Sequence, residues 1–136
     1  MKTNQKKQIF GWLRILLAVL IAVMALTVVS CGKTEITSDG SEKTFTFEVV
    51  DVDGQVTTFT VTTVKATVGE ALLDEGLIEG EDSQYGLYVK EVNGIYADYT
   101  DTGTYWAFYV NGAYGAAGVD TTPVEDGATY AFKVEK

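Results

Sequence analysis

The chain has 136 residues, and its nineteen acidic residues outnumber its ten basic residues, which gives a formal net charge of −9 at pH 7. All nineteen acidic residues but only six lysines follow Cys31, so residues 32–136 carry a charge of −13. This balance excludes nucleic-acid binding, which needs clusters of lysine and arginine, and it excludes attraction to anionic lipid headgroups.

The N-terminal residues have the layout of a secretory signal. Lysines near the start and Arg14 precede an uncharged apolar stretch at 15–29, which ends in small residues. Val28-Val29-Ser30-Cys31 resembles the lipobox of bacterial lipoproteins, in which cleavage occurs before the cysteine and its thiol carries a diacylglycerol. We therefore predict a lipoprotein signal peptide over 1–30 and lipidation of Cys31. Localisation would be the bacterial cell membrane, lipid-anchored at the extracytoplasmic face.

Two alternatives for this segment are less favoured. An uncleaved anchor would have to span the roughly 30 Å hydrocarbon core, whereas fifteen helical residues span about 22 Å. An ordinary signal peptide would leave Cys31 as a free reactive thiol in an exported protein. Residues 31–43 are predicted to be the lipidated cysteine and a flexible polar tether, and residues 44–136 to be the folded domain.

The first predicted elements are two strands joined by a hairpin. Apolar residues alternate with polar ones at 45–49 and again at 57–61, which is typical of strands with one buried face. A three-residue loop, 52–54, with Gly54 left-handed, places Phe47 opposite Phe59 and keeps the apolar side chains on one face. Asp51 to Gly54 also begins like a calcium loop, but the later ligand spacing is wrong, so we interpret it as a turn.

A short helix is predicted next. Thr67 and Glu70 have the spacing of a capping box, which places the helix at 68–75. Gly76 would end it in a left-handed conformation, and Leu72 would then contact Leu77 in a Schellman motif.

The remainder of the chain is predicted to be strands and turns. An acidic loop at 79–82 is followed by strand residues at 87–92 and 95–96, and then by strand residues at 104–110 and 113–114. Each of these two pairs surrounds an Asn-Gly dipeptide of the type I′ turn. A last strand is predicted at 129–134. The predicted class is α+β, with mostly antiparallel strands and one short helix crossing the sheet.

The residue types argue against catalysis. The chain has no histidine, it has no arginine after Cys31, and three serines follow that cysteine: Ser38, Ser41 and Ser83. A nucleophile with its base cannot be assembled from these residues, and a zinc site would lack its usual nitrogen and sulfur ligands. We predict that the protein is not an enzyme and has no metal and no cofactor.

The most unusual stretch is the aromatic segment Tyr105-Trp106-Ala107-Phe108-Tyr109-Val110, because both faces of the predicted strand are bulky. One interpretation is a central strand buried on both faces. The other is an exposed aromatic platform that binds a ligand, with Tyr114, Tyr96 and Tyr99 nearby.

Several motifs in the chain resemble the transcobalamin C-terminal-like domain of bacterial surface proteins. The matching segments lie within about 45–136: Thr67-Val68-Gly69-Glu70-Ala71-Leu72-Leu73, Val92-Asn93-Gly94, residues 105–112, Gly118-Val119-Asp120 and Asp126-Gly127. The resemblance implies a β-grasp-like fold. Vertebrate relatives of this family form the smaller domain of cobalamin carriers and cover one face of the corrin. The resemblance therefore implies cobalamin or another large planar ligand.

Together these observations predict a lipid-anchored extracytoplasmic binding module that captures cobalamin or a similar small ligand for uptake by a membrane transporter. The alternative is a cell-surface module, of adhesion type, that binds a protein or a glycan. The candidate ligand-binding residues are Tyr105, Trp106, Tyr109, Tyr114 and Tyr96.

Overall fold

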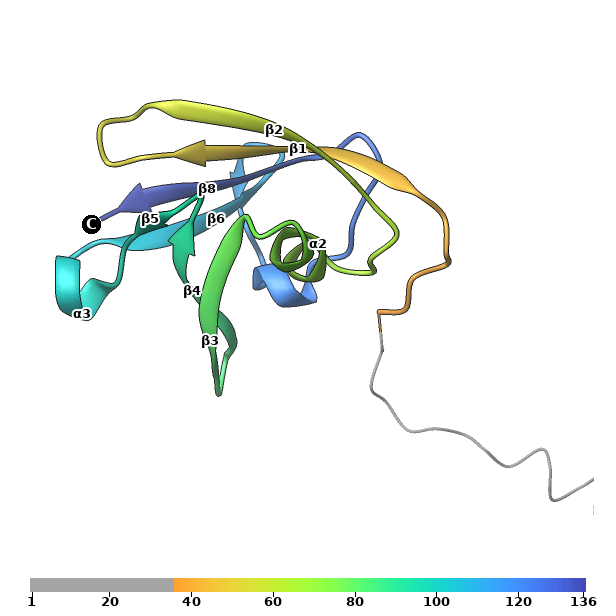
Figure 1. Cartoon of the computed structure of the whole chain (residues 1–136). Helices are drawn as coiled ribbons and strands as arrows, with labels where there is room; N and C mark the ends of the chain where they lie inside the picture. The colour runs from red at the N-terminus through yellow and green to blue at the C-terminus, as the bar shows by residue number, and fades with distance from the viewer. Residues whose placement is uncertain (1–35) are drawn as a thin grey trace, which may run out of the picture. The chain divides into compact units, whose positions relative to one another are not determined.

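The computed structural model describes residues 36–136, and the predicted signal peptide and Cys31 lie outside this range. The strands form two sheets (Figure 1). The five-stranded sheet has the order β2-β1-β8-β6-β7, with β1 at Lys43–Val50, β2 at Val56–Thr63, β6 at Tyr105–Val110, β7 at Ala113–Tyr114 and β8 at Thr129–Glu135. The three-stranded sheet has the order β3-β4-β5, with β3 at Ile78–Ser83, β4 at Gly86–Val92 and β5 at Ile95–Tyr96.

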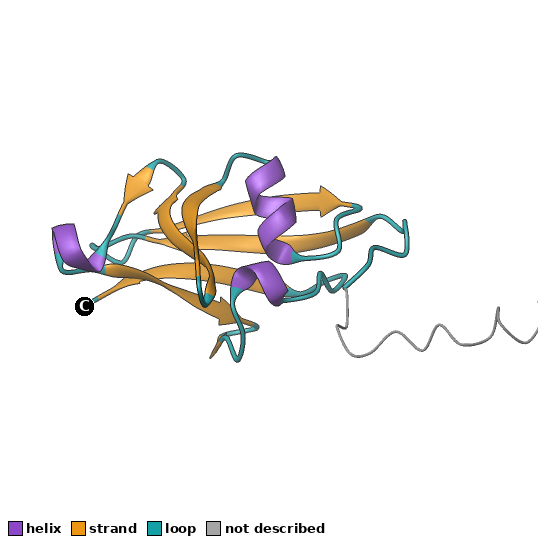
Figure 2. Cartoon of the chain, turned by 90° about the horizontal axis from the view of Figure 1, so that it is seen from below, coloured by secondary structure: helices purple, strands orange, loops and turns teal. Residues whose placement is uncertain are grey.

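The five-stranded sheet has one covered face and one open face. Helix α2 (Val68–Asp74) crosses the covered face, and the short 3-10 helix η1 (Val119–Thr121) and the three-stranded sheet lie on the same side (Figures 1 and 2). A further helical turn, α3, spans Tyr99–Thr102. Within residues 36–136 no element covers the opposite face. Only the central β1–β8 pair is parallel, and the other strand pairs are antiparallel. The predicted α+β, β-grasp-like class is confirmed.

The β1–β2 hairpin has the predicted register. Phe47 pairs with Phe59, and Phe45 pairs with Val61. The Asp51 amide donates to the Gln55 carbonyl, so the loop between the strands consists of residues 52–54, as predicted. Gly54 has a φ of 80°, in the left-handed region. The Asp51 carboxylate accepts the amides of residues 53 and 55 at 2.9 Å each. That carboxylate therefore stabilises the turn, in agreement with the interpretation that the segment is not a calcium loop.

Helix α2 has the predicted capping interactions at both ends. The Thr67 hydroxyl accepts the Glu70 amide, and the Glu70 carboxylate accepts the Thr67 amide, which completes the capping box. At the other end, the Gly76 amide donates to the Leu73 carbonyl and the Leu77 amide donates to the Leu72 carbonyl, in the pattern of a Schellman motif. The helix ends at Asp74, one residue before the predicted end.

Both Asn-Gly dipeptides form the expected turns, because the four residues have φ between 48° and 82°. The predicted acidic loop at 79–82 is wrong, since these residues belong to strand β3. Five of the six residues of β3 are exposed, so no apolar alternation marks it, and its pairing with β4 makes it a strand. Helix α3 is also absent from the prediction, although Asp98 caps its start and Gly103 ends it with a φ of 69°.

The hydrophobic core lies between the two sheets and α2. The side chains of Phe45, Phe47, Leu72 and Tyr130 are fully buried in it. All described core residues fall between 45 and 132, so residues 36–136 have a core of their own. No helix among these residues is long and apolar enough to cross a membrane.

Candidate functional site

The aromatic strand β6 has two different faces. Trp106 and Phe108 point into the core, where they are 7% and 8% exposed. Because side chains alternate along a strand, Tyr105 and Tyr109 lie on the open face of the five-stranded sheet, and both are half-buried. Tyr114 on β7 pairs with Tyr109, and its side chain is 60% exposed. The strand is therefore buried on its core face and only partly covered on the other, so it is not a central strand buried on both faces, and ligand binding by the open face stays a prediction.

Three tyrosines on the open face form what we call the tyrosine cluster: Tyr105, Tyr109 and Tyr114. Glu135 on β8 holds two of them, because the Tyr105 hydroxyl donates to Oε2 at 3.2 Å and the Tyr109 hydroxyl donates to Oε1. The rings of Tyr109 and Tyr114 meet edge to face at 5.2 Å. Lys133 Nζ lies 4.3 Å from the centre of the Tyr109 ring, in a cation–π contact. These contacts restrict the positions of the three rings.

The surroundings of Tyr105 and Tyr109 raise the pKa of both hydroxyls. The neighbouring Tyr114 hydroxyl, desolvation and Glu135 together raise the pKa of Tyr105 to about 12. The pKa of Tyr109 is also raised, mainly because its hydroxyl donates to Glu135. The hydroxyls of Tyr105 and Tyr109 therefore stay neutral to a higher pH than that of an ordinary tyrosine.

Two of the five predicted binding residues lie elsewhere. Trp106 is in the core on the other face of β6, and its Nε1 is buried without a hydrogen-bond partner. Tyr96 lies on β5 of the three-stranded sheet, where its hydroxyl donates to Asp101 at 2.7 Å. This bond is the main reason why the pKa of Tyr96 is raised to about 12. The structure brings together Tyr105, Tyr109 and Tyr114 and separates Trp106 and Tyr96 from them.

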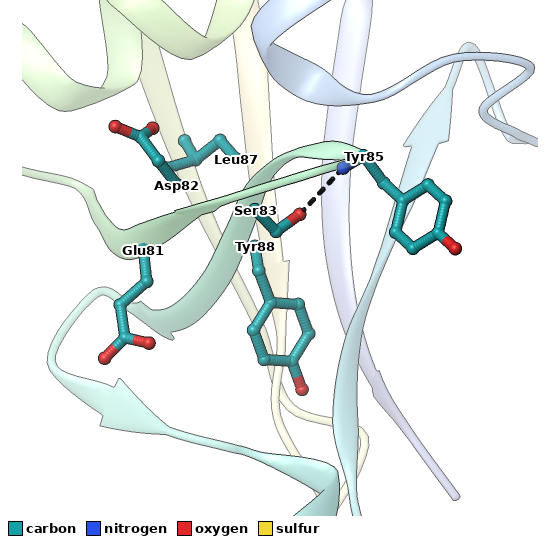
Figure 3. A pocket seen from close by; sticks show the side chains of 6 residues that line it. All are labelled: Glu81, Asp82, Ser83, Tyr85, Leu87 and Tyr88. Atoms are coloured by element: carbon teal, nitrogen blue, oxygen red, sulfur yellow. Dashed lines mark hydrogen bonds between the residues drawn. The ribbon is translucent and has the colours of Figure 1, made fainter.

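A second candidate region, which the sequence analysis missed, lies on the β3–β4 hairpin (Figure 3). We call it the hairpin hollow. Its volume is about 350 Å³, and its lining residues are Glu81, Asp82, Ser83, Tyr85, Leu87 and Tyr88. The Tyr85 side chain is 88% exposed, and its amide donates to Ser83 Oγ at 3.1 Å. The Tyr88 hydroxyl accepts the Tyr99 amide at 3.4 Å, which connects the hollow to α3.

Lys90 forms two ion pairs beside the hairpin hollow. Its Nζ lies 3.0 Å from a Glu81 oxygen and 3.1 Å from an oxygen of Asp98, whose side chain is 8% exposed. Hydrogen bonds to these two carboxylates raise the pKa of Lys90. The hydrogen bond from Lys90 lowers the pKa of Asp98, which also accepts the Thr100 amide at the start of α3. Lys90 thereby joins β3, β4 and the segment before α3.

The hairpin hollow had a weak signal in the sequence. Tyr85 precedes the strand predicted at 87–92 and Tyr88 lies within it, but isolated tyrosines are common at protein surfaces. Only the pairing of β3 with β4 brings Glu81 opposite Tyr88. Within residues 36–136 no group of three or more histidine, cysteine, aspartate or glutamate side chains is arranged to hold a metal ion.

Comparison with known proteins identifies the family. Residues 65–136, more than half of the chain, match the model described as "Domain of unknown function (DUF4430)", and the chain belongs to this family. No curated protein matches the chain.

Two solved structures are similar to this one. A "putative metal binding protein" from Ruminococcus gnavus ATCC 29149 matches with a TM-score of 0.65 and 29% identity, over 69% of this chain and 97% of that protein. Haptocorrin in complex with Cbi matches with a TM-score of 0.57 and 20% identity. The haptocorrin match covers 80% of this chain but only 28% of haptocorrin. The predicted resemblance to the transcobalamin-like domain is therefore confirmed for the fold.

Proposed function

We propose that this member of the DUF4430 family is a non-catalytic module that binds a flat small molecule on the tyrosine cluster, with cobalamin as the first ligand to test. One observation carries the proposal. Three tyrosine rings lie together on the open face of the sheet, and Glu135 accepts hydrogen bonds from two of their hydroxyls. Rings fixed in this way lose little conformational entropy when a ligand binds.

The chemistry of the cluster suits a large flat molecule. Tyrosine rings supply apolar contact area, and their hydroxyls interact with polar groups at the edge of a ligand. Strands β6, β7 and β8 form a continuous surface there, whereas the hairpin hollow is too small to enclose a corrin. The fold likeness to haptocorrin, crystallised with Cbi, supports the choice of cobalamin as the first ligand.

The proposal includes the predicted location. A lipid on Cys31 would hold residues 36–136 at the extracytoplasmic face of the membrane, close to a transporter that accepts the captured ligand. The strongly acidic surface supports anchoring by lipid rather than by charge, because the segment after Cys31 has a charge of −13.

Titration of residues 36–136 with cyanocobalamin tests the proposal, because Trp106 is the only tryptophan in this segment. Cobalamin absorbs where tryptophan emits, so a bound ligand quenches Trp106 through the sheet without touching it. We expect saturable quenching that Tyr109→Ala removes and Tyr85→Ala, a matched change at the hairpin hollow, leaves intact. An absence of saturable quenching up to the solubility limit of the vitamin would contradict the proposal for cobalamin.

A specific observation favours a second candidate function, the binding of a glycan at the hairpin hollow. Its volume of about 350 Å³ lies at the low end of ligand pockets, which are about 300–1,000 Å³. The apolar faces of sugar rings stack on aromatic side chains such as those of Tyr85 and Tyr88. The carboxylates of Glu81 and Asp82 accept hydrogen bonds from sugar hydroxyls.

The second candidate has an opposite experimental signature. A panel of soluble oligosaccharides would shift the amide NMR signals of residues 81–88, and Tyr85→Ala would remove these shifts while Tyr109→Ala would not. If every oligosaccharide leaves these signals unchanged at millimolar concentration, the glycan candidate is rejected and the cobalamin titration is unaffected.

A further inference from the structure

Among the residues that the structure describes, strand β2 lies at an edge of the five-stranded sheet and pairs only with β1 (Figure 1). It has eight residues, none of them charged, and contains no proline, no glycine and no bulge in its pairing with β1. Natural proteins usually protect such edges with lysines, prolines, bulges or covering segments, because an open edge pairs with other strands. Ser38 Oγ donates to the Val64 carbonyl at one end, and the edge from Val56 to Thr62 is open in the described structure.

The edge sequence is nearly symmetric. Residues 56–64 read Val-Thr-Thr-Phe-Thr-Val-Thr-Thr-Val, which is the same in both directions about Thr60 except that Phe59 and Val61 exchange places. In an antiparallel pair of two copies centred on Thr60, Thr60 therefore faces Thr60, Thr58 faces Thr62, and the apolar Phe59 faces Val61 of the other copy. Such self-matching is what a two-fold interface requires.

The backbone N–H and C=O groups on the outer side of β2 belong to the residues that this pairing requires. The Asp51 amide donates to the Gln55 carbonyl, so residues 51 and 55 form a hydrogen-bonded pair within the hairpin. Hydrogen-bonded and non-hydrogen-bonded pairs alternate along an antiparallel ladder. The backbone groups of Thr57, Phe59 and Val61 consequently point toward β1, and those of the even-numbered residues point outward. Thr60, at the centre of the symmetric sequence, is thus free to donate to and accept from Thr60 of a second copy.

The side chains and charges agree with this pairing. On the open face of the sheet, threonines of the two copies would meet across the seam. Within one copy, Thr44 on β1 and Thr62 on β2 already make such a contact, with their hydroxyl oxygens 2.9 Å apart. On the covered face, the half-buried Phe59 would lie beside Val61 of the second copy. None of the eight residues of β2 is charged, so the paired strands bring no like charges together. A chain with so many carboxylates therefore has a seam that brings none of them face to face.

We propose that two copies of this chain associate through antiparallel pairing of their β2 strands about a two-fold axis at Thr60. The two five-stranded sheets then form one continuous sheet. Both tyrosine clusters remain free, because β6 and β7 lie at the other side of each sheet. The proposal is independent of which ligand the clusters bind.

Cysteine substitution tests the register directly, because residues 36–136 contain no cysteine. The two Cα atoms of a hydrogen-bonded antiparallel pair are about 5.5 Å apart, within disulfide range. We expect Thr60→Cys to form a covalent dimer in a glutathione redox buffer. Thr58→Cys alone should not, since its own copies would be offset by about 13 Å. A mixture of Thr58→Cys and Thr62→Cys should cross-link. Equal cross-linking of all three single variants, or of none, would overturn the proposal.

Sedimentation provides the second measurement. Across about 10 µM to 1 mM, where weak interfaces are measured, we expect the sedimentation coefficient to rise with concentration. Thr60→Pro should abolish this rise, because it removes an outward donor without removing a bond to β1. Thr60→Lys should abolish it by placing two ammonium groups together, although it lowers the net negative charge. Thr100→Lys, an exposed control on α3, should not. Dimerisation by folded Thr60→Pro, as judged by circular dichroism, would contradict the proposal.

Discussion

The two sheets display tyrosines in different ways. In the tyrosine cluster, a shared carboxylate accepts two hydroxyls and Lys133 lies on one ring, so the rings have fixed positions. On the three-stranded sheet, Tyr85 projects from a hairpin with its side chain 88% exposed, and Lys90 lies 5.7 Å from the Tyr88 ring. A fixed aromatic surface suits one flat ligand, whereas exposed rings on a hairpin can adapt to several.

Removing the shared carboxylate should have the largest effect on the fixed surface. Glu135→Ala leaves the hydroxyls of Tyr105 and Tyr109 without their acceptor, so both rings must be ordered by the ligand itself. We expect the affinity for cyanocobalamin to fall about ten-fold. The matched control is Asp101→Ala, which frees the Tyr96 hydroxyl on the other sheet in the same way and should leave the affinity unchanged. Equal losses in both variants would show that the cluster is not the binding surface.

The three-stranded sheet depends instead on one lysine. Lys90→Met removes the ammonium group that joins Glu81 to Asp98, and it leaves the little-exposed Asp98 carboxylate without its cation. We expect the melting temperature to fall by several degrees, because a charged group without its partner destabilises a fold. Lys43→Met removes an exposed ion pair with Asp39 and is the control, with little expected effect. Similar melting temperatures for the two variants would contradict a bracing role for Lys90.

The features that could be predicted from the sequence depend on residues close together in the chain. Asp53-Gly54 and the alternation around it determine the first hairpin, and Thr67 and Glu70 determine where α2 starts. The helical turn α3 has equivalent signals in Asp98 and Gly103, although the prediction does not include it.

The distribution of the aromatic residues between the two faces of β6 and between the two sheets could be predicted only in part. The alternation along 105–110 separates Trp106 from Tyr105 and Tyr109 in any strand, so their opposite faces were visible in the sequence. The position of Glu135 next to Tyr105 depends on the pairing of β6 with β8, across thirty residues. The placement of Tyr96 on a separate sheet depends on strand order, which no local pattern encodes.

Tyrosine ionisation distinguishes the two regions residue by residue. Asp101 is the main cause of the raised pKa of Tyr96, and Glu135 is the main cause of the raised pKa of Tyr109. Asp101→Asn should therefore lower the pKa of Tyr96 from about 12 and leave that of Tyr109 unchanged, and Glu135→Gln should do the reverse. NMR titration of the ring carbons measures each tyrosine separately. A change in both residues with either variant would show that the two regions are coupled.

The smallest expected effect is on stability at high pH. A tyrosine whose pKa is higher in the folded state than in the unfolded state stabilises the fold while it is protonated. That contribution is complete below the unfolded pKa of about 10 and is lost as the pH rises toward the folded value of about 12 for Tyr105 and Tyr96. We expect the urea midpoint to fall between pH 10 and 12, and to fall less in Tyr105→Phe, which cannot ionise. A midpoint with the same pH dependence in that variant would mean that Tyr105 keeps an ordinary pKa, and that the tyrosine cluster is less fixed than its contacts indicate.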